Sequence, residues 1–184
     1  VGAGVAEALG AALQRPTLFP ALIEGSFAFE PDPDFPPPAL PAVVASTGRR
    51  HDRIVADPAR TGLIAGRWSA PPLPDLPRDR PLAIIGTGEY AYTPFRVALA
   101  LEEEGHDVRF QSTTRSPILV GDAIASRREF PDNYGDGIAN YLYNLDPRRL
   151  PVICYEHPAM PATHSLAAEI GGLALVTEAP CRAS

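Results

Sequence analysis

The chain has 184 residues, of which 45% are hydrophobic, and its formal net charge at pH 7 is -6. This length is enough for one domain with a good core, and no apolar run approaches the roughly 18 residues of a membrane-spanning helix, so we expect no membrane span. The acidic balance offers no strongly basic face to neutralise phosphates, so we expect no nucleic-acid partner, whereas a small anion needs only a local positive pocket.

The cysteine content indicates a reducing compartment. Cys154 and Cys181 are the only cysteines and form no CxxC motif, so we expect two free thiols and a cytoplasmic location. The sequence begins at Val1, contains one methionine, Met160, and does not start with a charged and then apolar leader. We therefore expect it to be a fragment or a processed piece of a longer protein.

The amino-terminal part combines one helix with proline-rich connectors. Apolar residues at a spacing of four predict a helix over residues 1–15, and TLFPALI (17–23) and SFAF (26–29) indicate short strands. The segment PDPDFPPPALP (31–41) cannot form regular structure, because proline removes amide donors and fixes φ. We interpret it as a stiff connector or a long loop, followed by a strand in AVVAS (42–46).

A strand, a helix and a second strand follow a further proline-rich run. PLAIIG (81–86) predicts an apolar strand, and DVRFQ (107–111) predicts the next one. Between them, Thr93 as N-cap and Pro94 at the first helical position predict a helix that Gly105 ends. Two strands joined by a helix are expected to lie parallel through a right-handed crossover.

The carboxyl-terminal part continues this alternation. LPVICYEH (150–157) predicts a buried strand, SLAAEIGG (165–172) a helix, and LALVTE (173–178) a final strand. DGIANYLYNLDP (136–147) predicts a helix whose buried face carries Ile138, Tyr141, Leu142 and Leu145. The fold class is therefore α/β, with a mostly parallel sheet in a Rossmann-like three-layer arrangement.

The carboxyl ends of the parallel strands are the expected place for a ligand. Three segments should emerge there: GTGEYAY (86–92), STTRSP (112–117) and EHPAM (156–160). The hydroxyls and the arginine of the second segment suit phosphate or carboxylate oxygens. They equally suit turn caps and a solvated arginine. The candidate ligand-binding residues are Gly86, Thr87, Gly88, Glu89, Ser112, Thr113, Thr114, Arg115 and Ser116.

Two residues are candidates for acid–base catalysis. Glu89 could act as a base or hold a ribose, and His157, whose side chain normally titrates near neutrality, could transfer a proton. The alternatives are a solvated Glu89 and an incidental histidine before a proline. We expect no metal site: DNYGDG (132–137) resembles the start of a calcium loop, but Tyr134 fills a ligand position and Tyr143 stands where the closing glutamate belongs. We expect no cofactor either.

A dinucleotide interpretation of GTGEYA (86–91) is the weaker alternative. Gly86, Gly88 and Ala91 follow a strand as GxGxxA, but the helix is expected to start only at Thr93, which leaves Ala91 in the loop. No acidic residue ends the second strand to hold a ribose. Only an NADP-binding variant, with Arg115 on a 2′-phosphate, remains open.

The sequence resembles the TRSP domain family. The resemblance is carried, over about residues 57 to 156, by PARTGL, IIGTGEYAYTPFRVALALEEEGHDVRFQSTTRSPI and NYLYNLDP. It implies that the domain lies carboxyl-terminal to a phosphoribosyltransferase domain, in bacterial gene clusters of tellurium resistance and stress response where a nucleoside-like metabolite is thought to be made. It also implies that Thr114, Arg115, Ser116 and Pro117 are the signature residues. Gly88 before Glu89 departs from the two acidic residues expected there.

The resemblance divides the chain at residue 56. Residues 1–56 would be an amino-terminal segment that could end a preceding phosphoribosyltransferase domain, and residues 57–184 a TRSP-like α/β domain. No acidic pair precedes STTRSP or STGRR (46–50), so the chain alone is not expected to be a complete transferase. The leading hypothesis is binding of a phosphorylated, nucleotide-like metabolite beside the transferase domain. The alternative is a non-catalytic module that docks onto that domain or onto a partner protein.

Overall fold

A computed structural model describes residues 3–14, short runs between 18 and 39, and residues 71–177. The chain divides into two compact units, Val1–Pro37 and Pro38–Ser184. The domain boundary expected at residue 56 and the strand expected at 42–46 lie outside the described residues. No helix in the described residues is long and apolar enough to cross a membrane.

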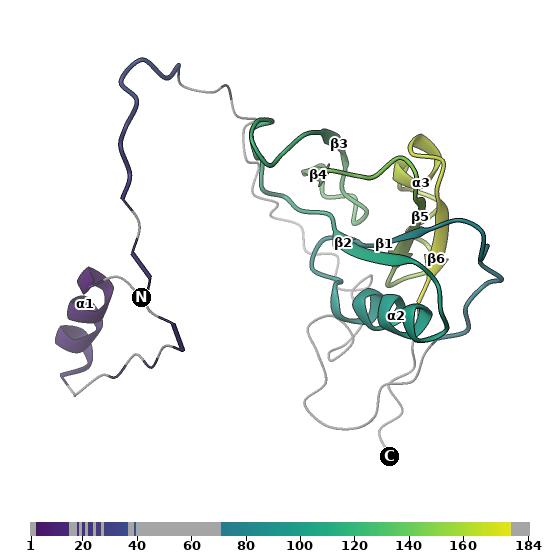
Figure 1. The fold of residues 1–184 in the computed structure, drawn as a ribbon, viewed down its shortest axis with the longest axis horizontal. Coiled ribbons are helices and arrows are strands. Elements are labelled where there is room, and N and C mark those ends of the chain that lie inside the picture. The colour runs from purple at the N-terminus through teal and green to yellow at the C-terminus, as the bar shows by residue number, and fades with distance from the viewer. Residues whose placement is uncertain are drawn as a thin grey trace. The chain divides into compact units, whose positions relative to one another are not determined.

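The first unit contains the predicted helix, α1 (Ala3–Leu13) (Figure 1). Its apolar side is exposed at Val5, Leu9 and Leu13, so the spacing of four formed a helix without burying that side. The described residues of the two strands predicted after it form no strand. The described part of the proline-rich segment 31–41 is irregular, as predicted, with a turn held by the Phe35 amide, which donates to the Asp32 carbonyl.

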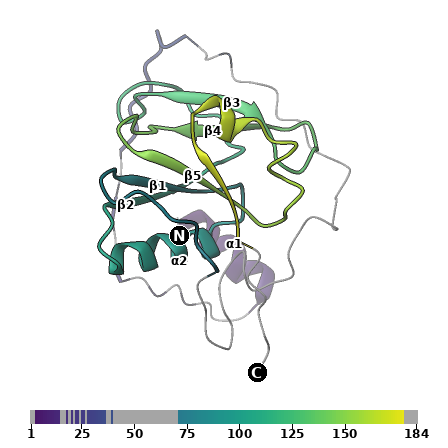
Figure 2. The ribbon, with the colours of Figure 1, turned by 90° about the vertical axis from the view of Figure 1, so that its right-hand side faces the viewer.

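A four-stranded parallel sheet forms the centre of the second unit, in the order β2-β1-β5-β6 (Figures 1 and 2). Its strands are β1 (Leu82–Gly86), β2 (Val108–Ser112), β5 (Leu150–Tyr155) and β6 (Leu173–Val176). The prediction that the strands around residues 81–86 and 107–111 are adjacent and parallel is confirmed. The α/β class with a mostly parallel sheet is confirmed with it.

Helix α2 (Tyr92–Glu103) joins β1 to β2, and it begins earlier than predicted. The N-cap is Ala91 rather than Thr93, because the Phe95 amide already donates to the Ala91 carbonyl at 3.0 Å. The predicted end is confirmed: Gly105 adopts a φ of 91°, a conformation that favours glycine, and its amide donates to the Glu102 carbonyl.

The central sheet is covered on both faces. On one face, α2 contributes Val97 and Leu101 to a core cluster with Ile84 and Val152. A second cluster packs Phe130, Leu142, Met160 and Leu166 against Ile85, Ile153 and Tyr155. Strands β1 and β5 are therefore buried at every position, which explains their continuous apolar sequences.

The helix predicted over residues 136–147 is wrong. This segment contains strand β4 (Ala139–Tyr143), which pairs antiparallel with β3 (Arg127–Pro131). The strand gives the tyrosines a period of two, and the rings of Tyr141 and Tyr143 stack with centroids 6.1 Å apart. The apolar spacing of Ile138 to Leu145 fits a helix as well as a strand, but backbone pairing with β3 on one side and with Thr114 on the other makes it a strand. The third layer therefore consists of this hairpin and the short helix α3 (Leu166–Glu169) (Figure 2). A Rossmann-like arrangement would have longer helices in this layer.

Candidate functional site

Two of the three predicted loops are joined by hydrogen bonds at the carboxyl edge of the sheet. The Gly88 amide donates to Thr113 Oγ1 at 2.7 Å, and the Thr113 amide donates to the Gly86 carbonyl at 2.9 Å. Gly88 follows β1 and Thr113 follows β2, so the parallel pairing of these strands brings the loops together. The sequence-based placement of both segments on one edge is confirmed.

Gly86 and Thr87 build this edge. A Cβ atom on Gly86 would lie 2.6 Å from the Tyr90 carbonyl oxygen, because the chain folds back tightly after β1. Thr87 is fully buried, and its hydroxyl donates to the Cys154 carbonyl at 3.0 Å. Thr87 therefore connects the loop after β1 to the end of β5, and both residues are buried.

The remainder of this loop separates a buried tyrosine from an exposed carboxylate. Gly88 has a φ of 61°, and Glu89 beside it is exposed. Tyr90 is fully buried, and its hydroxyl donates to the Thr177 carbonyl at 2.9 Å at the end of β6. Burial raises the pKa of Tyr90, which keeps this hydroxyl protonated. Ala91 lies just before α2, as expected, which disfavours the dinucleotide fingerprint.

The STTRSP loop is held against strand β4. The Thr114 amide donates to the Tyr141 carbonyl at 3.0 Å, and the Tyr141 amide donates back at 2.8 Å. The Thr114 hydroxyl accepts the Ser116 amide at 3.1 Å. Tyr143 Oη donates to the Ser116 carbonyl at 2.8 Å and accepts the Ile118 amide at 2.7 Å. Thr113 and Thr114 therefore use their hydroxyls to shape the loop, as the turn-capping alternative predicts.

The other three polar side chains of this loop take no part in these hydrogen bonds. Ser112, Arg115 and Ser116 are exposed. In the part of the chain that the structure describes, none of their side chains forms a hydrogen bond or an ion pair. The loop thus presents one guanidinium and two hydroxyls on a backbone that is fixed by its neighbours.

A buried polar group lies behind this edge, at the start of the third predicted segment, EHPAM (156–160). Glu156, directly after β5, is fully buried and accepts a hydrogen bond from Tyr134 Oη. Asn133 Nδ2 lies 3.4 Å from the Thr87 hydroxyl and 3.2 Å from the Met160 sulfur. The DNYGDG motif, which we considered only as a calcium loop, was the signal for these contacts.

The hydrogen bonds of Asp132 explain the composition of the DNYGDG motif. Its carboxylate accepts the amides of Tyr134, Asp136 and Ile138 at 2.8, 3.0 and 2.9 Å. Burial alone would raise the pKa of Asp132, but these amides and that of Gly135 outweigh it and lower the pKa. The motif is therefore an amide-binding turn, and the described residues contain no group of three or more potential metal ligands.

The two catalytic candidates lie in turns after β1 and β5. Glu89 is exposed, and His157 is half-buried with Nδ1 accepting the Ala159 amide at 3.1 Å. A different histidine, His164, is buried, and its Nδ1 lies 2.7 Å from Tyr155 Oη. Burial lowers the pKa of His164, so it is neutral around pH 7. His157 thus has a turn-capping role, and its contacts among the described residues do not identify it as an acid or base.

The thiol of Cys154 is free and buried in β5, and burial raises its pKa to about 12. Cys181 lies outside the described residues. A thiol in this environment stays protonated at physiological pH, so Cys154 packs as a small apolar side chain.

These contacts define a parallel α/β domain whose loops meet at the carboxyl edge of its sheet. A family model described as "TRSP domain C terminus to PRTase_2" matches residues 68–170, which is more than half of the chain. The chain belongs to the TRSP domain family. No curated protein and no solved structure matches it. The signature residues 114–117 lie within the matched region and coincide with the loop held by β4.

Proposed function

We propose that this domain binds a phosphorylated, nucleotide-like metabolite at the STTRSP loop and works beside a phosphoribosyltransferase domain in the same polypeptide. The position of the family, carboxyl-terminal to such a domain, supports the second part. A transferase of this type handles phosphorylated sugars and nucleotides, so a neighbouring domain that holds one of them is chemically consistent. The nucleoside-biosynthesis and tellurium-resistance setting and the cytoplasmic location belong to the same proposal.

The observation that supports ligand binding most strongly is the exposed guanidinium of Arg115 on a fixed loop. Thr113 and Thr114 hold the backbone before Arg115, and the Thr114 hydroxyl accepts the Ser116 amide after it. Arg115 is therefore presented with little conformational freedom in the main chain. A guanidinium binds a phosphoryl group through two parallel charge-assisted hydrogen bonds. Ser112 and Ser116 would add hydroxyl contacts to the same oxygens.

The catalytic contribution of the domain is a separate part of the proposal. Glu89 is exposed on the loop that Thr113 joins to the signature loop, so it would be the nearer candidate for holding a ribose or accepting a proton. His157 would require release of its turn contact to Ala159 before Nδ1 could act. Gly86, Thr87, Gly88, Thr113 and Thr114 would support the site by holding its backbone.

Calorimetric titration of ribose 5-phosphate and AMP into the full chain tests the proposal. Arg115→Ala should lose about 1.5–3 kcal/mol of affinity, the scale of a hydrogen bond to a charged group. Arg115→Lys should also weaken binding, because the ammonium keeps the charge but lacks the planar fork. Thermal melts should show little change, since Arg115 is exposed. Arg78→Gln, which removes an exposed positive charge elsewhere, is the matched control.

A docking module is the second candidate, favoured by the exposed residues after the signature. Ile118, Leu119 and Val120 are consecutive, apolar and exposed, an arrangement that suits a protein contact. If no phosphorylated compound binds in an Arg115-dependent way, the ligand-site proposal is wrong. The loop would then serve to present these three side chains to the transferase domain.

A further inference from the structure

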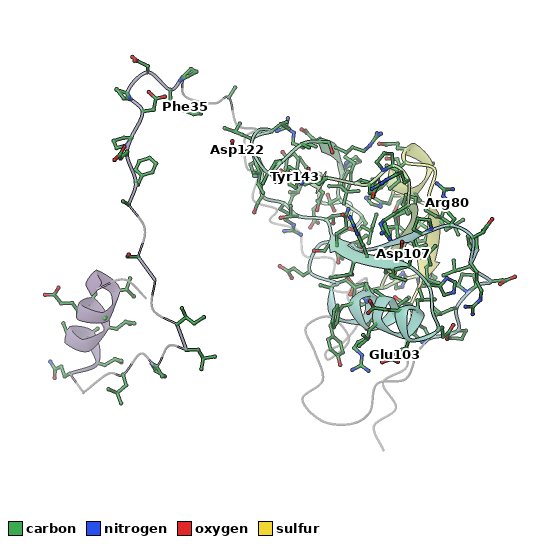
Figure 3. All side chains as sticks on the ribbon, in the orientation of Figure 1. Phe35, Arg80, Glu103, Asp107, Asp122 and Tyr143 are labelled. Atoms are coloured by element: carbon green, nitrogen blue, oxygen red, sulfur yellow. The ribbon has the colours of Figure 1, made fainter. Side chains whose placement is uncertain are left out.

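The second unit has an arginine-lined cavity at the end of the sheet opposite the STTRSP loop. The cavity has a volume of about 570 Å³, within the range of small-molecule sites. Its lining includes Arg149 and Pro151 at the amino end of β5, Arg128 of β3, and Ile170 after α3. Figure 3 labels Arg80, a further lining residue, on the side of the unit that carries α3.

Positive charge is concentrated in this cavity although the chain as a whole is acidic. Four of the nine arginines in the described residues line it: Arg80, Arg127, Arg128 and Arg149. Two carboxylates, those of Asp146 and Glu169, also line it. Asp146 is already paired with Arg148, whose Nε and terminal nitrogen contact its two oxygens at 2.9 Å each. Arg148 lies outside the lining, and Arg149 Nε also lies 3.8 Å from Asp146 Oδ2. The lining as a whole therefore holds four guanidinium groups against two carboxylates.

One arginine of the cavity is fixed and two are unengaged. Arg149 is only 8% exposed, and one of its terminal nitrogens donates to Asp107 Oδ1 at 2.8 Å and to the Leu82 carbonyl at 3.2 Å. Arg80 and Arg128 are exposed, and neither has an ion pair or a hydrogen bond within the described part of the chain. Guanidinium groups gathered around one cavity repel one another unless an anion neutralises them.

Apart from Ser126, the rest of the lining is apolar. Leu142, Leu145, Pro147, Pro151 and Ile170 form this part of the surface. An inorganic anion would use only the arginines, whereas a molecule with an anionic group and a planar or apolar body would contact both surfaces.

We propose that this cavity is a second ligand site, and that it binds a nucleotide or a related organic phosphate through Arg80, Arg128 and Arg149. Two phosphoryl groups match several guanidinium forks better than one, so a diphosphate is the preferred form. The site is independent of the function proposed for the STTRSP loop, because the two lie at opposite ends of the parallel strands and share no residue.

Removing a positive charge from the cavity and removing a negative charge from it should change the affinity for an anion in opposite directions. ADP and pyrophosphate are titrated into the full chain at low and moderate salt. Arg80→Gln and Arg128→Gln should each weaken ADP binding about tenfold or more. Glu169→Gln should strengthen it, since it removes a carboxylate from the lining. ADP should bind more tightly than pyrophosphate, and both affinities should fall as salt rises.

Two control variants separate this site from the first one. Arg78→Gln removes one positive charge outside the cavity and should leave the affinity unchanged. Arg115→Ala should leave the Arg128-dependent binding unchanged, even if it abolishes a second binding event. The proposal is overturned if neither ADP nor pyrophosphate binds, or if Arg78→Gln weakens binding as much as Arg128→Gln does. If Arg115→Ala abolishes ADP binding while Arg80→Gln and Arg128→Gln do not weaken it, the cavity proposal is overturned and the proposal for the STTRSP loop stands.

Discussion

The hydroxyl of Thr113 accepts the Gly88 amide at 2.7 Å, and this contact joins the loop after β2 to the loop after β1. Thr113 is buried, so its hydroxyl is held in place by the surrounding structure. The family signature thus begins directly after a residue that ties the two loops together. The position of Arg115 depends on this contact and on the pairing of Thr114 with Tyr141.

Thr113→Val should destabilise the fold by about 1–3 kcal/mol, the cost of leaving the half-buried Gly88 amide without its acceptor. Valine preserves the branched shape, so little packing is lost. Thr113→Ser, which keeps the hydroxyl, should retain most of the stability. Urea unfolding of the three proteins measures the difference, and equal loss in both variants would mean that the methyl group, not the hydrogen bond, is important.

Gly86→Ala should destabilise the fold by about 1–3 kcal/mol, as expected for overpacking. Its new Cβ would lie 2.6 Å from the backbone oxygen of Tyr90, so the turn after β1 would have to move. Gly10→Ala is the control, because Gly10 lies inside α1 with open space around it. Thermal melts should show a lower transition temperature for the Gly86 variant only. An unchanged Gly86→Ala melt would show that the turn has room to adjust.

Asp132→Ala should cost at least about 2 kcal/mol, because several amides lose a charged acceptor. Asp132→Asn keeps one side-chain oxygen and should cost less. The folded-state pKa of Asp132 is lowered, so its carboxylate stabilises the fold above the unfolded pKa of about 4. This contribution is lost as pH falls through the folded pKa. Unfolding at pH 7 and pH 3 should therefore show the wild-type advantage over Asp132→Asn shrinking in acid.

The buried His164 should make the fold less stable as pH falls from 7 to 5. Burial lowers its pKa below the usual value of about 6.5, although the Pro131 backbone and the Asp132 and Glu169 charges oppose the shift. The unfolded chain therefore binds a proton in this range that the folded chain does not, which favours unfolding. His164→Phe should remove part of this slope in urea unfolding at pH 7, 6 and 5. A slope identical to that of wild type would exclude His164 as its source.

The sequence by itself determined the elements whose signals are local. The helix between β1 and β2 and its end at Gly105 follow from residues within a few positions of one another. The apolar runs around residues 82–86 and 150–155 identified strands buried on both faces. Alternation of strands and helices then gave the parallel sheet, and with it the edge where the predicted loops meet.

Tertiary structure decided what depends on contacts distant in sequence. Residues 139–143 form a strand because β3 and Thr114 supply backbone partners that no local spacing reveals. For the same reason Thr113 became a buried acceptor while Arg115 stayed exposed, although both belong to one hydroxyl-rich run. The arginine-lined cavity gathers residues from positions 80 to 170, and only packing of the hairpin and α3 on the sheet brings them together. Side-chain type is local information, whereas burial and proximity arise when remote segments pack, so composition alone could not separate scaffold from site.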